Sequence, residues 1–327
     1  MISIPRRAVL GAPLALAAPA LLPGAADAQT DSTRPIRLIV TVAPGGAVDL
    51  TARLLAQHMA GPMQRQFLVE NRPGANGVIA AEAVAKAPPD GTMLLVAPRE
   101  VFGVNPVLYA PLPYDAERAF APIGIATAGH YVLVANPGLG VTTLADLVAM
   151  ARRRELAYGS TGIGSMPHLN VEAFARDAGI RLLHVPFRGT APSATATVAG
   201  DVALMIATPP SVAALVQDGR LVALGVGSPT RLPQFPTVPT LTEAGIAPNA
   251  LMPNYFALAA AAGTPAPLVA RLNAAMRQAL EVPETIDRLR AGGLTPAPGS
   301  PEELQATIAA DIRHFGELIS VANIRRE

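Results

Sequence analysis

Short apolar runs alternate with helix-type segments along the first hundred residues of this chain. Residues 36–42, 67–70 and 93–97 are almost wholly apolar, as buried strands are. A helix with Asp49 in its first turn follows the first run, and residues 78–86 predict a second helix. Proline- and glycine-rich turns at 71–74 and 88–91 separate these elements. The alternation predicts a parallel sheet with crossover helices.

A second alternating set begins after the turn at Asn136, Pro137 and Gly138. Its predicted strands are residues 156–158, 182–185, 202–206 and 221–225, and its predicted helices are 143–153, 166–177, 191–199 and 211–217. Thr143 and Asp146 have the spacing of a capping box. The pattern predicts a second α/β unit.

The last third predicts one strand, 255–261, and three helices, 267–280, 284–291 and 301–321. Because one strand cannot make a sheet, we expect this region to pack against the first unit. The predicted domains are residues 29–128 together with 250–327, and residues 129–249. The chain would cross between them near 125–134 and 249–255, and two crossings indicate a hinge beside a ligand-binding cleft.

Residues 1–28 have the pattern of an export signal. They contain paired arginines at 6–7, an Ala/Leu-rich run over 8–22 and an A-x-A site that ends at Ala28. The pattern predicts Tat-type export, cleavage near Ala28 and a periplasmic mature protein. A membrane anchor is the alternative, but prolines at 13, 19 and 23 interrupt the short apolar run.

Composition excludes several classes of function. The formal net charge is +1, with 25 basic and 24 acidic residues, which does not favour nucleic acid as a partner. The chain has no cysteine, so it has neither disulfides nor thiol chemistry. The five histidines lack metal-binding spacing, and no segment after residue 28 is long and apolar enough to span a membrane. We therefore expect no metal and no cofactor.

Two glycine-rich loops lie where a predicted strand ends and a helix begins, at residues 43–46 and 159–164. A third such junction, at 186–190, contains an arginine. Loops of this kind direct backbone N–H groups toward the positive end of a helix dipole, which favours an anion. Because they follow the carboxyl ends of strands, they should face each other across the hinge and hold a small anion.

Several motifs together resemble one protein family. They are RPIR at 34–37, APGGxxD at 43–49, NRPGANG at 71–77, PPDGTMLL at 88–95, NPVLY at 105–109, YGSTGIGS at 158–165, HVPFRGTAP at 184–192, PTVPTLTEAG at 236–245 and GTPAPLVARLN at 263–273. The set runs in order from about residue 33 to the C-terminus. It resembles the Bug family, the TctC-like solute-binding proteins of tripartite tricarboxylate transporters.

The resemblance implies a two-domain α/β fold of the Venus flytrap, type II-like kind, in which each domain has a mostly parallel sheet flanked by helices. It implies capture of a small carboxylate, such as a di- or tricarboxylate or an aromatic acid, and delivery to a membrane permease by a protein that we expect to be a monomer. In the family, main-chain groups and ordered waters of the two glycine-rich loops hold one carboxylate.

Two other functions remain open from the sequence. A family member can present its solute to a membrane sensor instead of a permease. An exported hydrolase or isomerase is the less favoured alternative, because the loop at 159–162 is neither a G-x-S-x-G elbow nor a dinucleotide-binding loop. We therefore expect no enzymatic activity.

The chain departs from the family pattern at two places. Arg99 and Glu100 replace a small polar stretch, so Arg99 is expected either to serve a second carboxylate or to pair with Glu100. Ala207 replaces an acidic residue, which predicts that the ligand is not an amino acid, because alanine cannot pair with an ammonium group.

The candidate ligand-binding residues come from the three loops and from positions close to them. They are Ala43, Pro44, Gly45, Gly46, Asp49, Arg99, Gly159, Ser160, Thr161, Gly162, Ser165, His168, Arg188, Gly189, Thr190 and Thr208. Asp49 is explained more readily as a carboxylate at a helix N-terminus than as a ligand contact. For His168 and Arg188, ligand contact and a purely structural position are equally consistent with the sequence.

Overall fold

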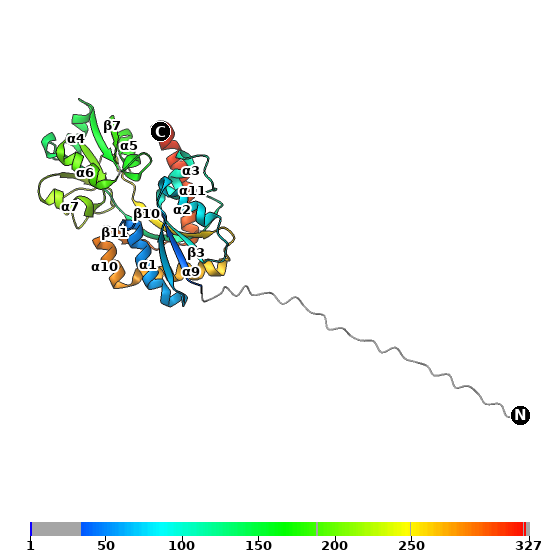
Figure 1. Cartoon of the computed structure of the whole chain (residues 1–327). Helices are drawn as coiled ribbons and strands as arrows, with labels where there is room; N and C mark the ends of the chain where they lie inside the picture. The colour runs from blue at the N-terminus through cyan, green and yellow to red at the C-terminus, as the bar shows by residue number, and fades with distance from the viewer. Residues whose placement is uncertain (2–33, 188, 249, 323, 325–327) are drawn as a thin grey trace. The chain divides into compact units, whose positions relative to one another are not determined.

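Two β-sheets, each with helices on its faces, form the part of the chain that the structure describes (Figure 1). The computed structural model describes Met1 and residues 34–187, 189–248, 250–322 and 324. Residues 2–28 of the predicted export signal and the candidate Arg188 lie outside the described residues. The two-domain α/β class predicted from the sequence is confirmed.

The first sheet contains strands from both ends of the described chain. They are β1 (Ile36–Val40), β2 (Phe67–Asn71), β3 (Met93–Pro98), β4 (Phe120–Gly129), β10 (Asn254–Ala261) and β11 (Leu294–Pro296), in the order β11-β4-β10-β3-β1-β2. The four strands β1 to β4 run in one direction, and β10 and β11 run in the other. Every residue of β10 is buried. The last third therefore extends the first sheet and builds none of its own.

Helices cover both faces of this sheet, and we call the sheet with these helices the first lobe. One face packs against α1 (Ala47–Met63), α9 (Ala266–Glu281) and α10 (Pro283–Ala291). The other face packs against α2 (Val78–Ala85), the π-helix η2 (Glu100–Val104) and the first half of α11 (Pro301–Val321). The short helix α3 (Asn105–Leu108) continues from η2.

The second sheet contains the middle of the chain. Its strands are β5 (Val132–Ala135), β6 (Leu156–Ser160), β7 (Leu182–Pro186), β8 (Leu204–Ala207) and β9 (Val222–Val226), in the order β7-β6-β8-β5-β9. Only β5 runs against the other strands of this sheet. Both sheets are thus mixed: most strands of each run in one direction, but three of the five neighbouring pairs in the first sheet and two of the four in the second are antiparallel.

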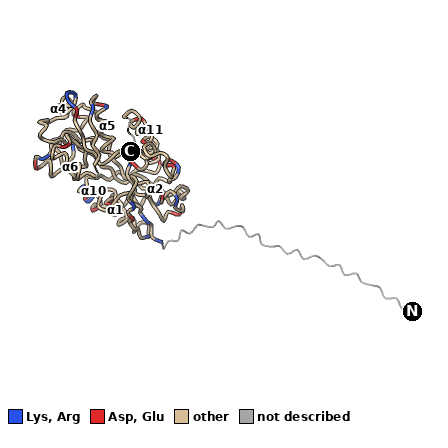
Figure 2. Tube along the Cα trace, turned by 45° about the horizontal axis from the view of Figure 1, so that its top comes forward, with Lys and Arg blue, Asp and Glu red and all other residues tan. Residues whose placement is uncertain are grey.

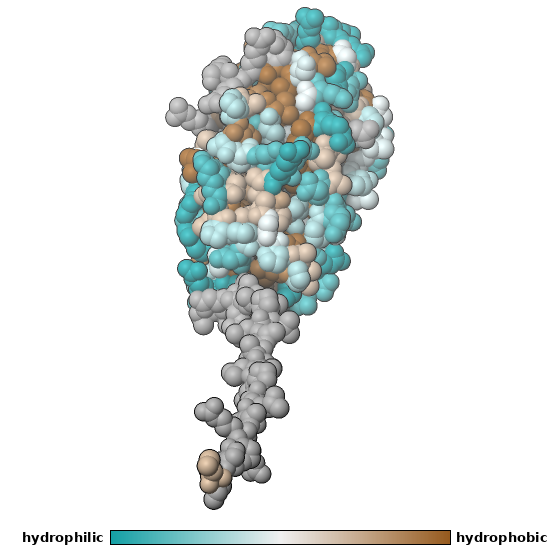
Figure 3. Space-filling model, turned by 90° about the vertical axis from the view of Figure 1, so that its right-hand side faces the viewer, coloured by the Kyte–Doolittle hydropathy of each residue, from teal (hydrophilic) through white to brown (hydrophobic). Residues whose placement is uncertain are grey.

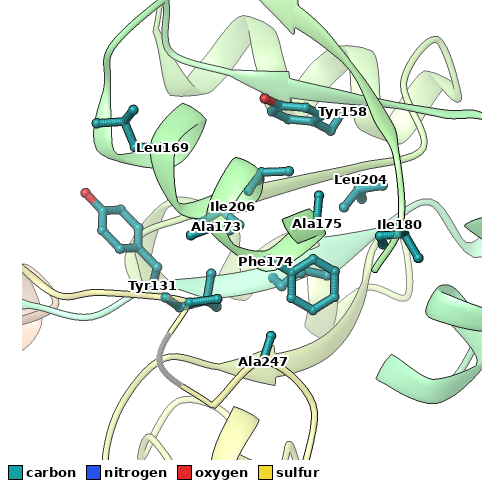
Figure 4. Packing of buried hydrophobic residues seen from close by; sticks show 14 of the residues in the cluster. Tyr131, Tyr158, Leu169, Ala173, Phe174, Ala175, Ile180, Leu204, Ile206 and Ala247 are labelled. Carbon is teal, nitrogen blue, oxygen red and sulfur yellow. The ribbon is translucent and has the colours of Figure 1, made fainter. Parts of the chain in front are cut away.

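Five helices pack on the second sheet and complete what we call the second lobe. One face carries α4 (Leu144–Ala151), α5 (Met166–Ala178) and α8 (Leu241–Ala244), and the other carries α6 (Thr190–Ala199) and α7 (Pro209–Gln217). Figure 4 shows Phe174 of α5 in this core, near Ala247. The predicted capping box of Thr143 and Asp146 is present at the start of α4.

The connection between the lobes is short. The sequence predicted a crossing near residues 125–134, and within that range β4 ends at Gly129 and β5 begins at Val132. The strand β4 itself was not predicted, because Pro122, Gly124 and Gly129 obscure its strand character. The chain returns from the second lobe to the first before Asn254, where β10 begins.

Helix α11 contributes to the cores of both lobes. Leu304 and Ile308, in its first half, are buried against the first sheet. Phe315 and Leu318, in its second half, are buried in the cluster that contains Phe174 of α5. One continuous helix therefore packs against both lobes, in addition to the two segments through which the chain passes from one lobe to the other.

The surface is mixed in charge and in hydropathy. Figure 2 shows acidic and basic residues interspersed along the described chain, and on the face in Figure 3 groups of apolar residues are broken up by polar ones. Leu68, Ile79, Leu183 and Val321 are large apolar side chains that remain exposed. Within the described ranges, no helix has both the length and the apolar character needed to cross a membrane.

Candidate functional site

Loops from both lobes line one cleft of about 1230 Å³. Its walls are residues 41–43 and 73–77, together with Pro98 and Thr161. Ala43 belongs to the first predicted glycine-rich loop and Thr161 to the second. The structure therefore brings the two loops to the same cleft.

The first loop joins β1 to α1 and leaves backbone donors available. Gly45 has a φ of 92°, which favours glycine, and Gly46 is the N-cap of α1 without a side-chain cap. Toward other described residues, the N–H groups of Ala43, Gly46 and Ala47 donate no hydrogen bond. These donors lie at the positive end of the α1 dipole, where an anion is favoured.

Asp49 fixes this loop from within. Its Oδ2 accepts hydrogen bonds from Gly45 N and Arg53 Nε, both at 2.9 Å, and its Oδ1 accepts one from Asn71 Nδ2 at 2.9 Å. Burial raises the pKa of Asp49, but these hydrogen bonds outweigh burial and hold the pKa below its usual value. The structure therefore places Asp49 as a support for the loop and takes the N–H of Gly45 away from a ligand.

The wall at residues 73–77 was not among the predicted site residues. Ala75, Asn76 and Gly77 have φ values of 45°, 51° and 87°, a left-handed turn that glycine and asparagine tolerate but that is unfavourable for alanine. Asn105 holds the turn, because its Oδ1 accepts from Asn76 Nδ2 at 2.8 Å and its Nδ2 donates to Asn76 O at 2.9 Å. Strained backbone of this kind is concentrated at functional sites. Gly74 and Gly77, which follow β2, were the signal in the sequence that could have indicated this wall.

Thr41, at the end of β1, also lines the cleft and was missed. Its side chain is buried, and its hydroxyl has no hydrogen-bond partner among the residues that the structure describes. A Cβ at Gly77 would lie 3.1 Å from Thr41 Cβ and 2.6 Å from Val101 Cγ2. The close approach of these segments therefore requires glycine at position 77.

The second loop joins β6 to α5 and satisfies several of its own donors. Ser160 Oγ accepts from Gly162 N at 3.0 Å, and Ser165 is the N-cap of α5. Gly164 N donates to His168 Nδ1 at 3.0 Å. The N–H groups of Thr161 and Ile163 donate to no other described residue. These two donors remain for an anion in the cleft.

Two stacked histidines pack against this loop and make hydrogen bonds to it. The ring centroids of His168 and His184 are 3.8 Å apart, with 7° between the ring planes. His184 Nε2 lies 2.6 Å from Ser160 Oγ, while His168 Nδ1 accepts from Gly164. His168 is 4% exposed and contributes no wall to the cleft. Of the two roles left open for His168, the structure therefore favours the buried supporting one.

Both imidazoles are held neutral. Burial, and then the neighbouring His184, lower the pKa of His168 to about 3, and burial lowers the pKa of His184 to about 4. The ordinary value is 6.5, which applies in the unfolded chain. Between pH 6.5 and 4 the unfolded state thus binds protons that the folded state does not. The two histidines therefore make their full contribution to the unfolding free energy above pH 6.5, and this contribution decreases as the pH is lowered.

We predict that His168→Gln flattens the decrease in unfolding free energy between pH 6.5 and 4. Glutamine can accept the Gly164 N–H hydrogen bond without titrating, so the loop keeps its support. Urea denaturation at several pH values measures the slope, with His58→Gln, on α1, as the matched control. If His168→Gln and the control retain the same slope as the unsubstituted protein, the assignment to the stacked pair is wrong.

Arg99 does not pair with Glu100, contrary to one of its two expected roles. Arg99 Nε donates to Asp311 Oδ2 at 2.9 Å, and Nη1 donates to Pro253 O at 2.8 Å. Its side chain is 13% exposed, and that of Asp311 is 4% exposed. The expectation failed because Asp311 lies 212 residues away on α11, where no sequence spacing indicates it.

Glu100 instead connects the two lobes. Its Oε1 accepts from Met166 N, the first residue of α5, at 3.3 Å, and its Oε2 accepts from Asn254 Nδ2 at 3.1 Å. Burial raises the pKa of Glu100, although these hydrogen bonds act in the opposite direction. A carboxyl group of the first lobe therefore occupies the N-terminus of the helix that follows the second loop.

Apolar packing between the lobes reaches Gly164. This residue has a φ of 75°, and a Cβ there would lie 2.2 Å from Leu108 Cδ2 of α3. The second loop therefore packs directly on the first lobe.

We predict that Gly164→Ala lowers the unfolding free energy by about 1–3 kcal/mol, because the methyl group overlaps Leu108. Gly162→Ala is the matched control, since Gly162 also has a positive φ, 130°, but no atom within 4 Å of its Cβ position. Urea denaturation compares the two variants, and Leu108→Ala should partly rescue Gly164→Ala. Equal destabilisation by both glycine substitutions would show that the contact with Leu108 is unimportant.

The remaining predicted residues lie outside the lining of the cleft. Pro44 is exposed within the first loop, and Gly159 is buried in β6, where a Cβ would lie 2.4 Å from Ser193 Oγ. Gly189 is the N-cap of α6, and Thr190 is its first residue. Thr208 precedes α7, and its hydroxyl lies 2.8 Å from Ser211 Oγ. Over the described ranges, no cluster of acidic residues and histidines could hold a metal ion.

Comparison with known proteins identifies the family. The family model for the tripartite tricarboxylate transporter family receptor, TctC, matches residues 51–324. The chain is 33% identical to protein BugT of Bordetella pertussis over 296 residues, which are 90% of each chain. Among solved structures, the periplasmic binding protein BugD is 28% identical with a TM-score of 0.75, covering 90% of this chain and 99% of BugD. R. palustris Rpa4515, solved with adipate, is 32% identical with a TM-score of 0.78, covering 90% of this chain and 98% of that chain.

The two glycine-rich loops at one cleft and the match over most of the chain point to the same conclusion. The chain belongs to the TctC family of tripartite tricarboxylate transporter receptors, which are solute-binding proteins and not enzymes.

Proposed function

We propose that this protein captures a small carboxylate in the cleft between its lobes and delivers it to a membrane permease of the tripartite tricarboxylate type. The observation that carries the proposal is the cleft itself, which Ala43 and Thr161 line from opposite lobes. Free N–H groups on both loops can hold carboxylate oxygens directly or through water. The family membership and the adipate bound to the R. palustris relative support this chemistry.

We also propose where the protein acts and how its domains move. The twin-arginine signal directs export to the periplasm and is cleaved near Ala28. Residues 29–128 with 250–327 form one domain and residues 129–249 form the other, and the protein acts as a monomer whose domains close on the solute. The short crossings beside Gly129 and Asn254 support a hinge at that position.

A thermal-shift screen tests the binding function. The purified protein is unfolded and refolded to remove carried-over ligand, and then mixed with mono-, di- and tricarboxylates, aromatic acids, amino acids and neutral amides. A ligand at a hundred times its dissociation constant stabilises by about 2.7 kcal/mol, which raises the melting temperature measurably. Stabilisation by carboxylates alone supports the proposal. Stabilisation by neutral amides or by none of these compounds contradicts it.

A further inference from the structure

The carboxyl group of Glu100 lies where the two lobes meet the segment that returns to the first lobe. Glu100 is the first residue of the π-helix η2 in the first lobe. Its Oε1 accepts a hydrogen bond at 3.3 Å from Met166 N, at the start of α5 in the second lobe. Its two oxygens also accept from Asn254 Nδ2, at 3.3 and 3.1 Å, where the returning chain begins β10. One carboxyl group therefore joins three segments that are far apart in the sequence.

The other segment that connects the lobes is also next to Glu100. Tyr131 lies between the end of β4 and the start of β5, and it is 5% exposed. Burial, and then the neighbouring carboxylate of Glu100, raise the pKa of Tyr131. Asn254 is oriented by Arg99 N, which donates to its Oδ1 at 3.2 Å. Glu100 is thus close to both connections, where a rotation of one lobe against the other has its axis.

The hydrogen bond to Met166 acts on the second glycine-rich loop, because that loop is tied to α5. Ser165 separates the loop from the helix and is the N-cap of α5. Its hydroxyl donates to Gly162 O at 2.7 Å. A displacement of the helix N-terminus therefore displaces the N–H groups of Thr161 and Ile163, which remain for a solute.

A second hydrogen bond from α5 ends in the returning segment. Asn170 is 1% exposed, and its Nδ2 donates to Met252 O at 3.0 Å. Asn170 lies one helical turn after Met166, so the two bonds hold successive turns of the same helix. The bond to Met252 leaves α5 free to pivot at its N-terminus, and the bond to Glu100 removes that freedom.

From these contacts we infer that Glu100 is a positioning residue, which sets the angle between the lobes at which both glycine-rich loops can hold one solute. Its effect on affinity rests on the proposed function. Donors on both lobes must lie within about 0.5 Å of their binding geometry at the same time. If fewer molecules of the free protein have that arrangement, the apparent dissociation constant increases by the same factor. Glu100 itself does not line the cleft, so it acts without contacting the solute.

Glu100→Ala and Glu100→Gln test the role of the hydrogen bonds. A glutamine oxygen at the position of Oε1 can accept from both Met166 N and Asn254 Nδ2, whereas alanine accepts from neither. Isothermal titration calorimetry uses the carboxylate that stabilises the protein most in the thermal-shift screen. We expect Glu100→Ala to weaken its binding about tenfold or more, and Glu100→Gln to weaken it less than about threefold.

Leu280→Ala is the matched control for a purely structural effect. Leu280 is 2% exposed and lies on α9 in the core of the first lobe, away from both connections. Its truncation should destabilise the fold, because it leaves a cavity. The folded protein should keep the affinity of the unsubstituted protein within about a factor of two, since its loops keep their arrangement.

A distance measurement tests the arrangement of the lobes without any ligand. The chain has no cysteine, so Ala270→Cys on α9 and Ala149→Cys on α4 provide two exposed sites for spin labels, one on each lobe. Pulsed dipolar electron paramagnetic resonance measures the distances between them. We expect the same distance distribution with Glu100 and with Glu100→Gln, and a broader one with Glu100→Ala.

An unchanged distance distribution or an unchanged affinity in Glu100→Ala overturns the inference and leaves the proposed function intact. An equal loss of affinity in Leu280→Ala also overturns it, because the loss would then follow from lower stability. If Glu100→Ala does not fold, Glu100→Leu takes its place, since leucine fills the space without accepting hydrogen bonds. If no carboxylate binds the unsubstituted protein, the proposed function is wrong, and the distance distributions still decide whether Glu100 positions the lobes.

Discussion

Replacement of Asp311 by alanine is expected to lower the free energy of unfolding by about 3–5 kcal/mol. The substitution leaves the Arg99 guanidinium largely buried without its charge partner. It also removes the acceptor for Tyr255 OH, which donates to Asp311 Oδ2 at 3.0 Å. Because Arg99 and Tyr255 adjoin the return crossing at Asn254, the region between the lobes should lose order first. Equilibrium urea denaturation measures the effect.

Asp287→Ala is the matched control for this prediction. Asp287 is 74% exposed and lies 3.5 Å from Arg290 on α10, so its removal should change stability by no more than about 0.5 kcal/mol. A similar small effect for Asp311→Ala would mean that Arg99 finds another partner. In that case, Asp311 would not be the charge partner on which the buried Arg99 depends.

Replacement of Ala43 by tryptophan is expected to weaken carboxylate binding on the order of 100-fold, or about 2.8 kcal/mol. Ala43 is exposed and lines the cleft, so an indole at this position fills space that the solute would occupy. Its backbone conformation is outside the left-handed region that favours glycine. The fold should therefore tolerate the larger side chain, and calorimetric titration measures the loss of affinity.

Ala306→Trp serves as the control, since Ala306 is exposed on α11 and contributes nothing to the lining of the cleft. We expect its affinity to equal that of the unsubstituted protein within a factor of two. Unchanged affinity in Ala43→Trp would place the ligand elsewhere.

The sequence predicted the elements with strong local signals. The apolar runs of β1, β3 and β6 and the capping box of α4 fall within a few residues of their predicted bounds. Pro122 and Gly124 hid β4, and the three-residue β11 is too short for any periodicity. These two strands form because β10, which is wholly buried, offers backbone partners to β4, and β4 does so to β11.

Only part of the candidate site was predicted, because sequence patterns indicate local structure and not contacts between distant segments. Loops at strand ends carry a local glycine signal, so Ala43 and Thr161 could be expected to meet. The pairing of Arg99 with Asp311, the hydrogen bond from Met166 to Glu100 and the stacking of His168 on His184 join distant segments. Such contacts depend on tertiary packing, and the spacing of residues along the chain does not predict them.

A crystal structure of the protein with the carboxylate that stabilises it most is the most direct test of the central claim. We predict that the carboxylate oxygens lie within about 3.2 Å of the N–H groups of Ala43 or Gly46 and of Thr161 or Ile163, or one water away from them. A ligand seated instead in the smaller cavity of about 450 Å³ lined by His130, Leu251 and Met252 would contradict the account.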